Sequence, residues 1–177
     1  MSPGAAHSWA AVAPGDEALA LWRLGFHFRE DPDGCTRLYH TESAARVTAR
    51  NWRALMHGDY ATAARAAMPE ILRRLESDPG ARVAWRSLPL PPPLEGVPQP
   101  AHPLRVLASP DVLTNRRALL VLIPGVGEIP AGVWGRQLCV TDCLERGTML
   151  QALRDARARG WAAVSLDPNR GAGHDGR

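Results

Sequence analysis

The sequence predicts an α/β fold, and three observations lead to this prediction. A continuous apolar run over residues 118–123 has the length and composition of a buried parallel strand. A glycine-rich turn follows it directly at Gly125 and Gly127, and a second apolar run lies at 162–166. The segment between the two runs has helical periodicity. Strand, helix and strand in this order form a right-handed βαβ unit.

The amino-terminal part is expected to contain a β-hairpin and a helical segment. Apolar and other residues alternate over 24–28, an Asp-Pro-Asp-Gly turn occupies 31–34, and the chain returns over 35–39. From residue 51 to 75, apolar residues recur at helical spacing. Because Pro69 interrupts this pattern, we expect two helices or a kink, with Pro69 in the first turn of the second helix.

Residues 89–103 contain seven prolines, which predicts an exposed linker or long loop in extended conformation. Such a segment can bind aromatic grooves, but a linker needs no partner, and we favour the linker. A short strand is expected at 104–108 after it. The helix of the βαβ unit is expected at 148–159, with Thr148 as its N-cap and Gly160 as its stop.

Composition is that of a single globular domain. The chain has 177 residues, which predicts a flexible terminus over 1–23 and one domain over 24–177. No run approaches the ~18 apolar residues of a membrane span, and residues 1–15 lack the pattern of a signal peptide, so we expect no membrane association and no secretion. Three cysteines make no even disulfide framework, which favours a reducing compartment.

The charge pattern does not favour nucleic-acid binding. The formal net charge is +3 and every cationic side chain other than histidine is an arginine. Arginines are adjacent only at 73–74 and 116–117, and acidic residues are interspersed throughout. A nucleic-acid surface would gather arginines on one face. We therefore expect solvated arginines rather than direct RNA binding.

The loop Gly125-Val126-Gly127 is the candidate functional site, since backbone N–H groups at the carboxyl edge of a parallel sheet bind anions. Pro130 takes the place of the third glycine of a dinucleotide fingerprint. A P-loop would need lysine where Val133 stands, and the chain has no lysine. No nucleotide or other cofactor is therefore expected.

A glycine loop after a strand also serves as the oxyanion hole of α/β-hydrolases. Those enzymes need a Gly-x-Ser-x-Gly elbow, and the chain contains none. Ser165 lies inside the 162–166 run without flanking glycines, and His174 is the only histidine after the loop. We expect no catalytic residues and no enzyme activity. A serine-hydrolase-like enzyme acting on small esters is kept as the alternative.

Five segments together resemble the Argonaute-binding (Arb-type) domain of the cotranscriptional regulator family, which is α/β-hydrolase-like: 118–127, 131–136, 147–148, 160–161 and 167–169. The resemblance implies the amino-terminal half of an α/β-hydrolase-like sheet. It also implies a non-catalytic adaptor in Argonaute-linked RNA silencing or cotranscriptional splicing regulation. The implied partners are an Argonaute-type protein or chromatin and splicing factors, in the nucleus or cytoplasm.

The departures from this family pattern predict a shortened, divergent pseudoenzyme. Pro124-Gly125-Val126-Gly127 stands where the family usually has His-Gly-Ser-Gly, and Pro130 replaces an arginine. Proline removes a backbone donor. The family's domain continues well past the 167–169 turn, so the domain is expected to be incomplete at its carboxyl end. Loss of function by truncation is one consequence.

Four further residues of these motifs are candidate structural or binding positions: Gly132, Trp134, Arg136 and Asn169. Trp134 would either line a pocket over the glycine loop or pack against the sheet edge. Arg136 would hold an anion, the loop, or a salt bridge with Asp142 or Glu145. Asn169 is expected in a turn. Cys139 and Cys143 lack the second pair of ligands that a zinc site needs, so no metal is expected.

Overall fold

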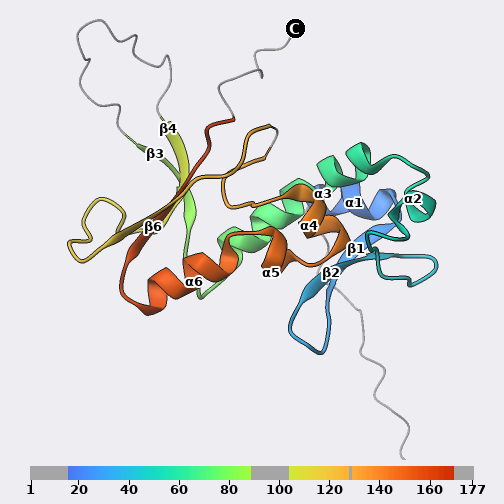
Figure 1. Cartoon of the computed structure of the whole chain (residues 1–177), viewed down its shortest axis with the longest axis horizontal. Coiled ribbons are helices and arrows are strands. Elements are labelled where there is room, and N and C mark those ends of the chain that lie inside the picture. Colours follow the sequence, from blue (N-terminus) through green and yellow to red (C-terminus); the bar gives the residue numbers. More distant parts are fainter. Residues whose placement is uncertain (1–15, 89–103, 128, 170–177) are drawn as a thin grey trace, which may run out of the picture.

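The computed structural model describes residues 16–88, 104–127 and 129–169. The sheet lies at one end of the molecule, the hairpin lies at the other, and a long helix runs between them (Figure 1). The elements are α1 Asp16–Arg23, β1 Phe26–Glu30, β2 Thr36–His40, α2 Trp52–Leu55, α3 Tyr60–Ser77, β3 Ala84–Leu88, β4 Leu104–Ala108, β5 Leu119–Leu122, α4 Arg136–Thr141, α5 Leu144–Gly147, α6 Leu150–Ala158 and β6 Ala162–Leu166. An α/β class is confirmed.

The expected hairpin is confirmed, and its turn is stabilised by charge. β1 and β2 pair antiparallel, and Phe26 and Phe28 point into the core. The carboxylate of Asp31 accepts hydrogen bonds from Arg37 Nη1 at 2.9 Å and from Tyr39 Oη at 2.7 and 2.8 Å. These bonds hold the pKa of Asp31 below its ordinary value, although desolvation opposes the shift.

The helical segment divides earlier than Pro69, which corrects the expected boundary. Gly58 has a φ of +80°, and the Asp59 carboxylate accepts a hydrogen bond from Thr62 N at 3.0 Å, which caps α3. Pro69 lies inside α3. The apolar face of α3 is buried on both sides of the proline, from Ala63 to Leu75. This burial outweighs the backbone hydrogen bond that a proline removes.

Residues 16–23, expected to be part of a flexible terminus, form α1 and are anchored to the core. The side chain of Leu21 is only 2% exposed and belongs to the same cluster as Ala63 and Ala64 of α3. Burial of Leu21 thus packs this short helix against α3. α1 therefore packs on the same core as the residues from 24 onward.

The sheet has the strand order β3-β4-β6-β5 and is mixed. The expected parallel pair of β5 and β6 is present, whereas β4 runs antiparallel to both β3 and β6. The strand β3 was not predicted from the sequence. The proline-rich stretch 89–103 lies outside the described residues, but it joins β3 to its antiparallel neighbour β4. This stretch, predicted as a proline-rich loop or linker within the single domain, thus connects two strands of the same sheet.

β5 was expected to be a buried strand, and only one of its faces is buried. Leu122 is 7% exposed and faces the core, whereas Leu119 and Val121 are 50% and 47% exposed. β5 is an edge strand of the described sheet, so it lacks a neighbour on one side. Its parallel partner β6 is the buried strand, since residues 162–165 are all buried.

Within the described residues, three helices lie between these strands, and the expected one, α6, has its N-cap one residue later than predicted. Met149 rather than Thr148 occupies the N-cap, although Thr148 Oγ1 still accepts a hydrogen bond from Leu150 N at 3.3 Å. At the other end Gly160 has a φ of +71°. Gly160 N donates to Arg157 O and Trp161 N to Ala156 O, both at 2.9 Å. This is the Schellman arrangement that ends a helix.

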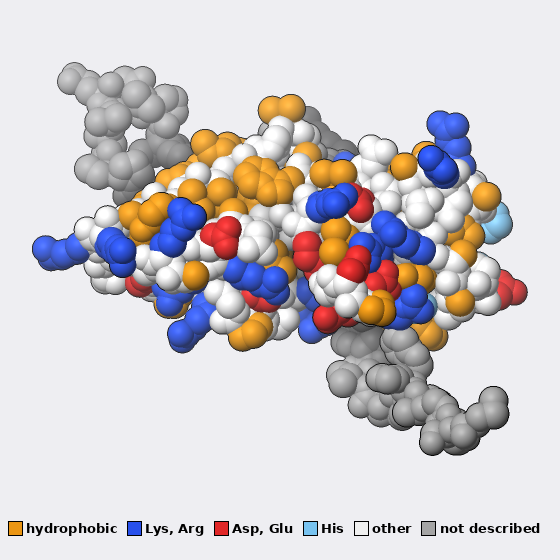
Figure 2. All heavy atoms as spheres, turned by 60° about the horizontal axis from the view of Figure 1, so that its bottom comes forward, with side chains coloured by type: hydrophobic (Ala, Val, Ile, Leu, Met, Phe, Trp, Pro, Cys, Tyr) orange, Lys and Arg blue, Asp and Glu red, His pale blue; other side chains and the backbone are white. Residues whose placement is uncertain are grey.

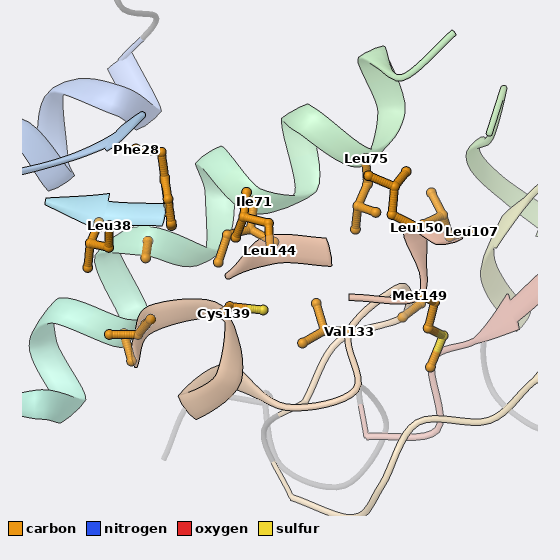
Figure 3. Close-up of a cluster of buried hydrophobic side chains, with 14 of the residues drawn as sticks. Phe28, Leu38, Ile71, Leu75, Leu107, Val133, Cys139, Leu144, Met149 and Leu150 are labelled. Atoms are coloured by element: carbon orange, nitrogen blue, oxygen red, sulfur yellow. The ribbon is translucent and has the colours of Figure 1, made fainter. Parts of the chain in front are cut away.

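One main apolar core joins the hairpin to the sheet. Ile71 and Leu75 of α3 face Cys139 of α4, Leu144 of α5 and Met149 (Figure 3). The core therefore depends on residues from both halves of the chain. No helix in the described ranges is long and apolar enough to cross a membrane.

Candidate functional site

The glycine loop lies where sequence analysis placed it, at the carboxyl end of the parallel pair. The loop follows β5, and Asn169 follows β6, so the two strand ends bring them together. Asn169 Nδ2 donates to Gly125 O at 2.9 Å and to Ile129 O at 2.8 Å. One amide thus holds both limbs of the loop, and Val126 is 94% exposed between them.

Gly132 is required by its backbone conformation and by close packing. It has a φ of +85°, and its N–H donates to Ser165 Oγ at 2.8 Å. A side-chain Cβ at this position would lie 2.8 Å from Leu107 Cδ2 and 2.9 Å from Leu75 Cδ1. Only glycine fits this turn without movement of the core.

The segment after Gly132 pairs with residues 147–149, so two of the motif segments are in direct contact. Trp134 N and Gly135 N both donate to Gly147 O, at 2.8 and 3.2 Å, and Met149 N donates to Gly132 O at 2.8 Å. Trp134 is 44% exposed, so its ring is only partly packed. Backbone hydrogen bonds thus join the motif segments 131–136 and 147–148.

Arg136 begins α4 and lies near Tyr60. Burial raises the pKa of Tyr60, and the positive charge of Arg136 opposes that shift. Asp142, one of the two carboxylates proposed for Arg136, pairs with Arg46 at 3.6 Å and with Arg146 at 3.1 Å. The second of these carboxylates, Glu145, accepts a hydrogen bond from the backbone N–H of Thr36 in the hairpin at 2.9 Å.

The side chain of Ser165 is fully buried and makes two hydrogen bonds. Its hydroxyl accepts the Gly132 N–H and lies 3.1 Å from Met149 Sδ, to which it donates. Ser165 therefore stabilises the turn at Gly132, and it does not have the exposed position of a nucleophile on a strand-to-helix elbow.

His27 and His40 belong to the hairpin, where their rings contact Thr41 and Ser43.

Substitution of Ser165 by alanine is expected to lower the free energy of unfolding by about 1–3 kcal/mol, because it leaves a buried N–H at Gly132 without its acceptor. Urea unfolding followed by tryptophan fluorescence measures this effect. Ser87→Ala on the exposed side of β3 is the control and should change stability by less than about 0.5 kcal/mol. Equal stability of the two variants would contradict the structural role of the hydroxyl.

A hollow that was not predicted from the sequence lies between the hairpin and the start of α3. It has a volume of about 270 Å³, and its lining includes Phe26, His40, His57 and Met56. Its one carboxylate, Asp59, is already used to cap α3. We assign this hollow no function.

Arginines and acidic residues are interspersed on the face shown in Figure 2 rather than sorted into a basic patch. The adjacent Arg73 and Arg74 both bind the buried carboxylate of Glu70, each at 2.7 Å. Desolvation acts to raise the pKa of Glu70, but hydrogen bonds to the two arginines outweigh it and lower that pKa. One acidic side chain within the fold therefore offsets part of the positive charge of this arginine pair.

Fold and site together define an α/β domain in which Asn169 holds the glycine loop and Ser165 holds the turn at Gly132. Over 64 residues, 36% of its length, the chain is 39% identical to human cotranscriptional regulator ARB2A. A Dictyostelium discoideum ARB2A homolog is 36% identical over the same length, and the Caenorhabditis elegans FAM172 family protein homolog Y75B8A.31 is 43% identical over 51 residues.

The chain is thus a relative of the ARB2A-type cotranscriptional regulators over about a third of its length, which confirms the family resemblance. The matched segment spans only 15% of the human protein and 17% of the Dictyostelium protein. No family model matches the chain. No solved structure matches it either, so the likeness to α/β-hydrolases stays a prediction.

Proposed function

We propose that this chain is a non-catalytic regulatory protein that acts by binding another protein. One observation carries the non-catalytic part of the proposal. The hydroxyl of Ser165, the one serine downstream of the glycine loop, is buried between Gly132 N and Met149 Sδ. A nucleophile must reach a substrate carbonyl beside an oxyanion hole, and a hydroxyl enclosed in this way does not.

The regulatory part of the proposal rests on the relatives, whose names describe cotranscriptional regulators. By the family resemblance, we propose an Argonaute-type protein as the partner and RNA silencing or cotranscriptional splicing control as the process. Chromatin or splicing factors are the second class of partner that the resemblance implies. Action in the nucleus follows from the same names and is part of the proposal.

We propose the exposed face of β5 as the binding surface. Leu119 and Val121 of the edge strand β5 are 50% and 47% exposed, and Ile123, directly after the strand, is 63% exposed. An edge strand offers backbone donors and acceptors to an extended partner segment. Alternate side chains then supply apolar contact on one face of the added strand. This combination fits a partner protein better than a small molecule.

Replacement of Val121 by aspartate is expected to weaken binding to a purified Argonaute-type protein by about tenfold or more, because it places a charge in an apolar contact. Surface plasmon resonance with the immobilised chain measures the affinity. Trp22→Ser on α1 is the matched control, since Trp22 is also about half exposed, at 52%, and lies at the hairpin end of the molecule.

Three outcomes separate the parts of the proposal. Loss of binding in Val121→Asp with normal binding in Trp22→Ser supports the partner and the surface. Equal binding by both variants contradicts the β5 surface, and absence of binding by the unchanged chain contradicts the Argonaute-type partner. Labelling of Ser165 by a fluorophosphonate probe would contradict the non-catalytic role.

A further inference from the structure

The three ligand-type side chains of Cys35, Cys143 and Glu145 meet at the contact between the hairpin and α5. Their sulfur and carboxylate oxygen atoms all lie within 4.8 Å of one another. Cys35 follows the hairpin turn, whereas Cys143 and Glu145 lie at the start of α5. Cys143 is fully buried, and the other two are half-buried. The nearby Cys139, which sequence analysis paired with Cys143, is not part of this group.

The backbone around the cluster holds the ligands in place. Thr36 N donates to Glu145 Oε2 at 2.9 Å, which orients the carboxylate. Cys35 N donates to Asp33 Oδ1 at 3.0 Å, and Gly147 N donates to Cys143 O at 3.0 Å. Hydrogen bonds of this kind to ligands and their neighbours fix the geometry of metal sites.

We infer that Cys35, Cys143 and Glu145 form a binding site for a thiophilic divalent cation of the Zn²⁺ type. Two thiolates and one carboxylate are ligands that Zn²⁺ accepts, and a water molecule would complete the tetrahedron. Zinc–sulfur bonds of about 2.3 Å place two sulfurs about 3.8 Å apart in a tetrahedral site. This separation lies inside the 4.8 Å limit of the cluster, so small side-chain movements suffice.

The electrostatic surroundings suit such a site. Two thiolates and a carboxylate carry three negative charges, which a divalent cation does not fully balance. Arg46 and Arg146 bring positive charge to this region, where they pair with Asp142, the neighbour of Cys143, at 3.6 and 3.1 Å. The ligands bind as thiolates, so metal binding releases the thiol protons.

The site would connect segments that are far apart in the sequence. It would link the hairpin to α5 across more than a hundred residues, at a contact already made by Thr36 and Glu145. A ligand that binds only the folded chain stabilises it by mass action. The cation is therefore expected to raise the melting temperature of the chain as well as to bind.

Titration of the full chain with Co²⁺ under reducing conditions tests the site. One equivalent of Co²⁺ should bind and produce thiolate-to-cobalt charge-transfer absorption, and Zn²⁺ should displace it. The substitution Cys35→Ser removes one of the two thiolates and should abolish this absorption. The substitution Glu145→Gln should weaken Co²⁺ binding by about tenfold or more. Cys139→Ala is the matched control and should bind Co²⁺ like the unchanged chain.

Circular dichroism establishes that each variant is folded, and melting with and without Zn²⁺ gives a second readout. The proposal is overturned if the reduced, folded chain gives no charge-transfer absorption, or if Cys35→Ser and Cys139→Ala bind Co²⁺ equally. A disulfide between Cys35 and Cys143 that persists in the presence of the metal would also overturn it. That result would assign the pair to thiol oxidation instead.

Discussion

Replacement of Gly147 by alanine is expected to destabilise the chain more than any other single change considered, by about 3 kcal/mol or more. A Cβ at this position would lie 2.7 Å from Cys139 Cα and closer still to Cys139 N. These are backbone atoms of α4, which cannot turn aside as a side chain can. Either α4 or α5 would have to shift, and both contribute to the main core.

Gly34→Ala provides the control for this experiment. Gly34 has a φ of +76° but no atom within 4 Å of the added Cβ, so only the backbone penalty of about 1–2 kcal/mol applies. Urea unfolding of the two variants compares the cost of the steric clash at Gly147 with the cost of the backbone conformation at Gly34. A Gly147→Ala variant as stable as Gly34→Ala would show that α4 and α5 are less closely packed than the structure indicates.

Replacement of Asp78 by alanine is expected to lower the free energy of unfolding by about 2–3 kcal/mol. The Asp78 carboxylate accepts hydrogen bonds from the backbone N–H groups of Gly80 and Ala81, at 3.0 and 2.7 Å, and from Arg154 Nε and Nη2. It thus ties the end of α3 to α6. Glu76→Ala, at an exposed position of the same helix, should change stability by less than about 0.5 kcal/mol.

The effect of Asp78 depends on pH in a defined direction. Its bond to Arg154, above all, lowers the pKa of Asp78 from the ordinary value. A carboxyl group with a lowered folded-state pKa stabilises the fold above its unfolded pKa of about 3.9, and this contribution is lost as the pH falls through the folded-state value. The difference in stability between the unchanged chain and Asp78→Ala should therefore be constant above about pH 5 and shrink below pH 4.

Local patterns predicted the parts of the fold that local chemistry determines. Alternation over 24–28 predicted β1 because alternate side chains of a hairpin face the core. The apolar runs and Gly160 predicted β5, α6 and β6 in the right order. Pro69 led to a wrong helix boundary, because burial of the apolar face of α3 outweighs the hydrogen bond that proline removes. The exposure of β5 could not be predicted, because it depends on which strands become neighbours.

The candidate site was predicted only in part for a similar reason. The sequence identified Gly132 and Asn169 as motif positions; in the structure Asn169 bonds the glycine loop and Gly132 bonds Ser165. The Ser165 hydroxyl accepts a hydrogen bond from Gly132 N, and this contact could not be predicted because the two residues are 33 positions apart. The cluster of Cys35 and Cys143 leaves no signal in sequence spacing at all, since tertiary packing alone brings the two thiols together.

The contact between the hairpin and α5 has a consequence for the newly made chain. Thr36 bonds Glu145, 109 positions later, and the buried faces of β2 and α4 meet in the same region. During synthesis the hairpin leaves the ribosome long before its packing partners are translated. The part of β2 that contacts α4 and α5 then stays open to water, where nascent chains aggregate or bind chaperones. Completion of the fold at the hairpin end should therefore wait for translation of residues 136–147.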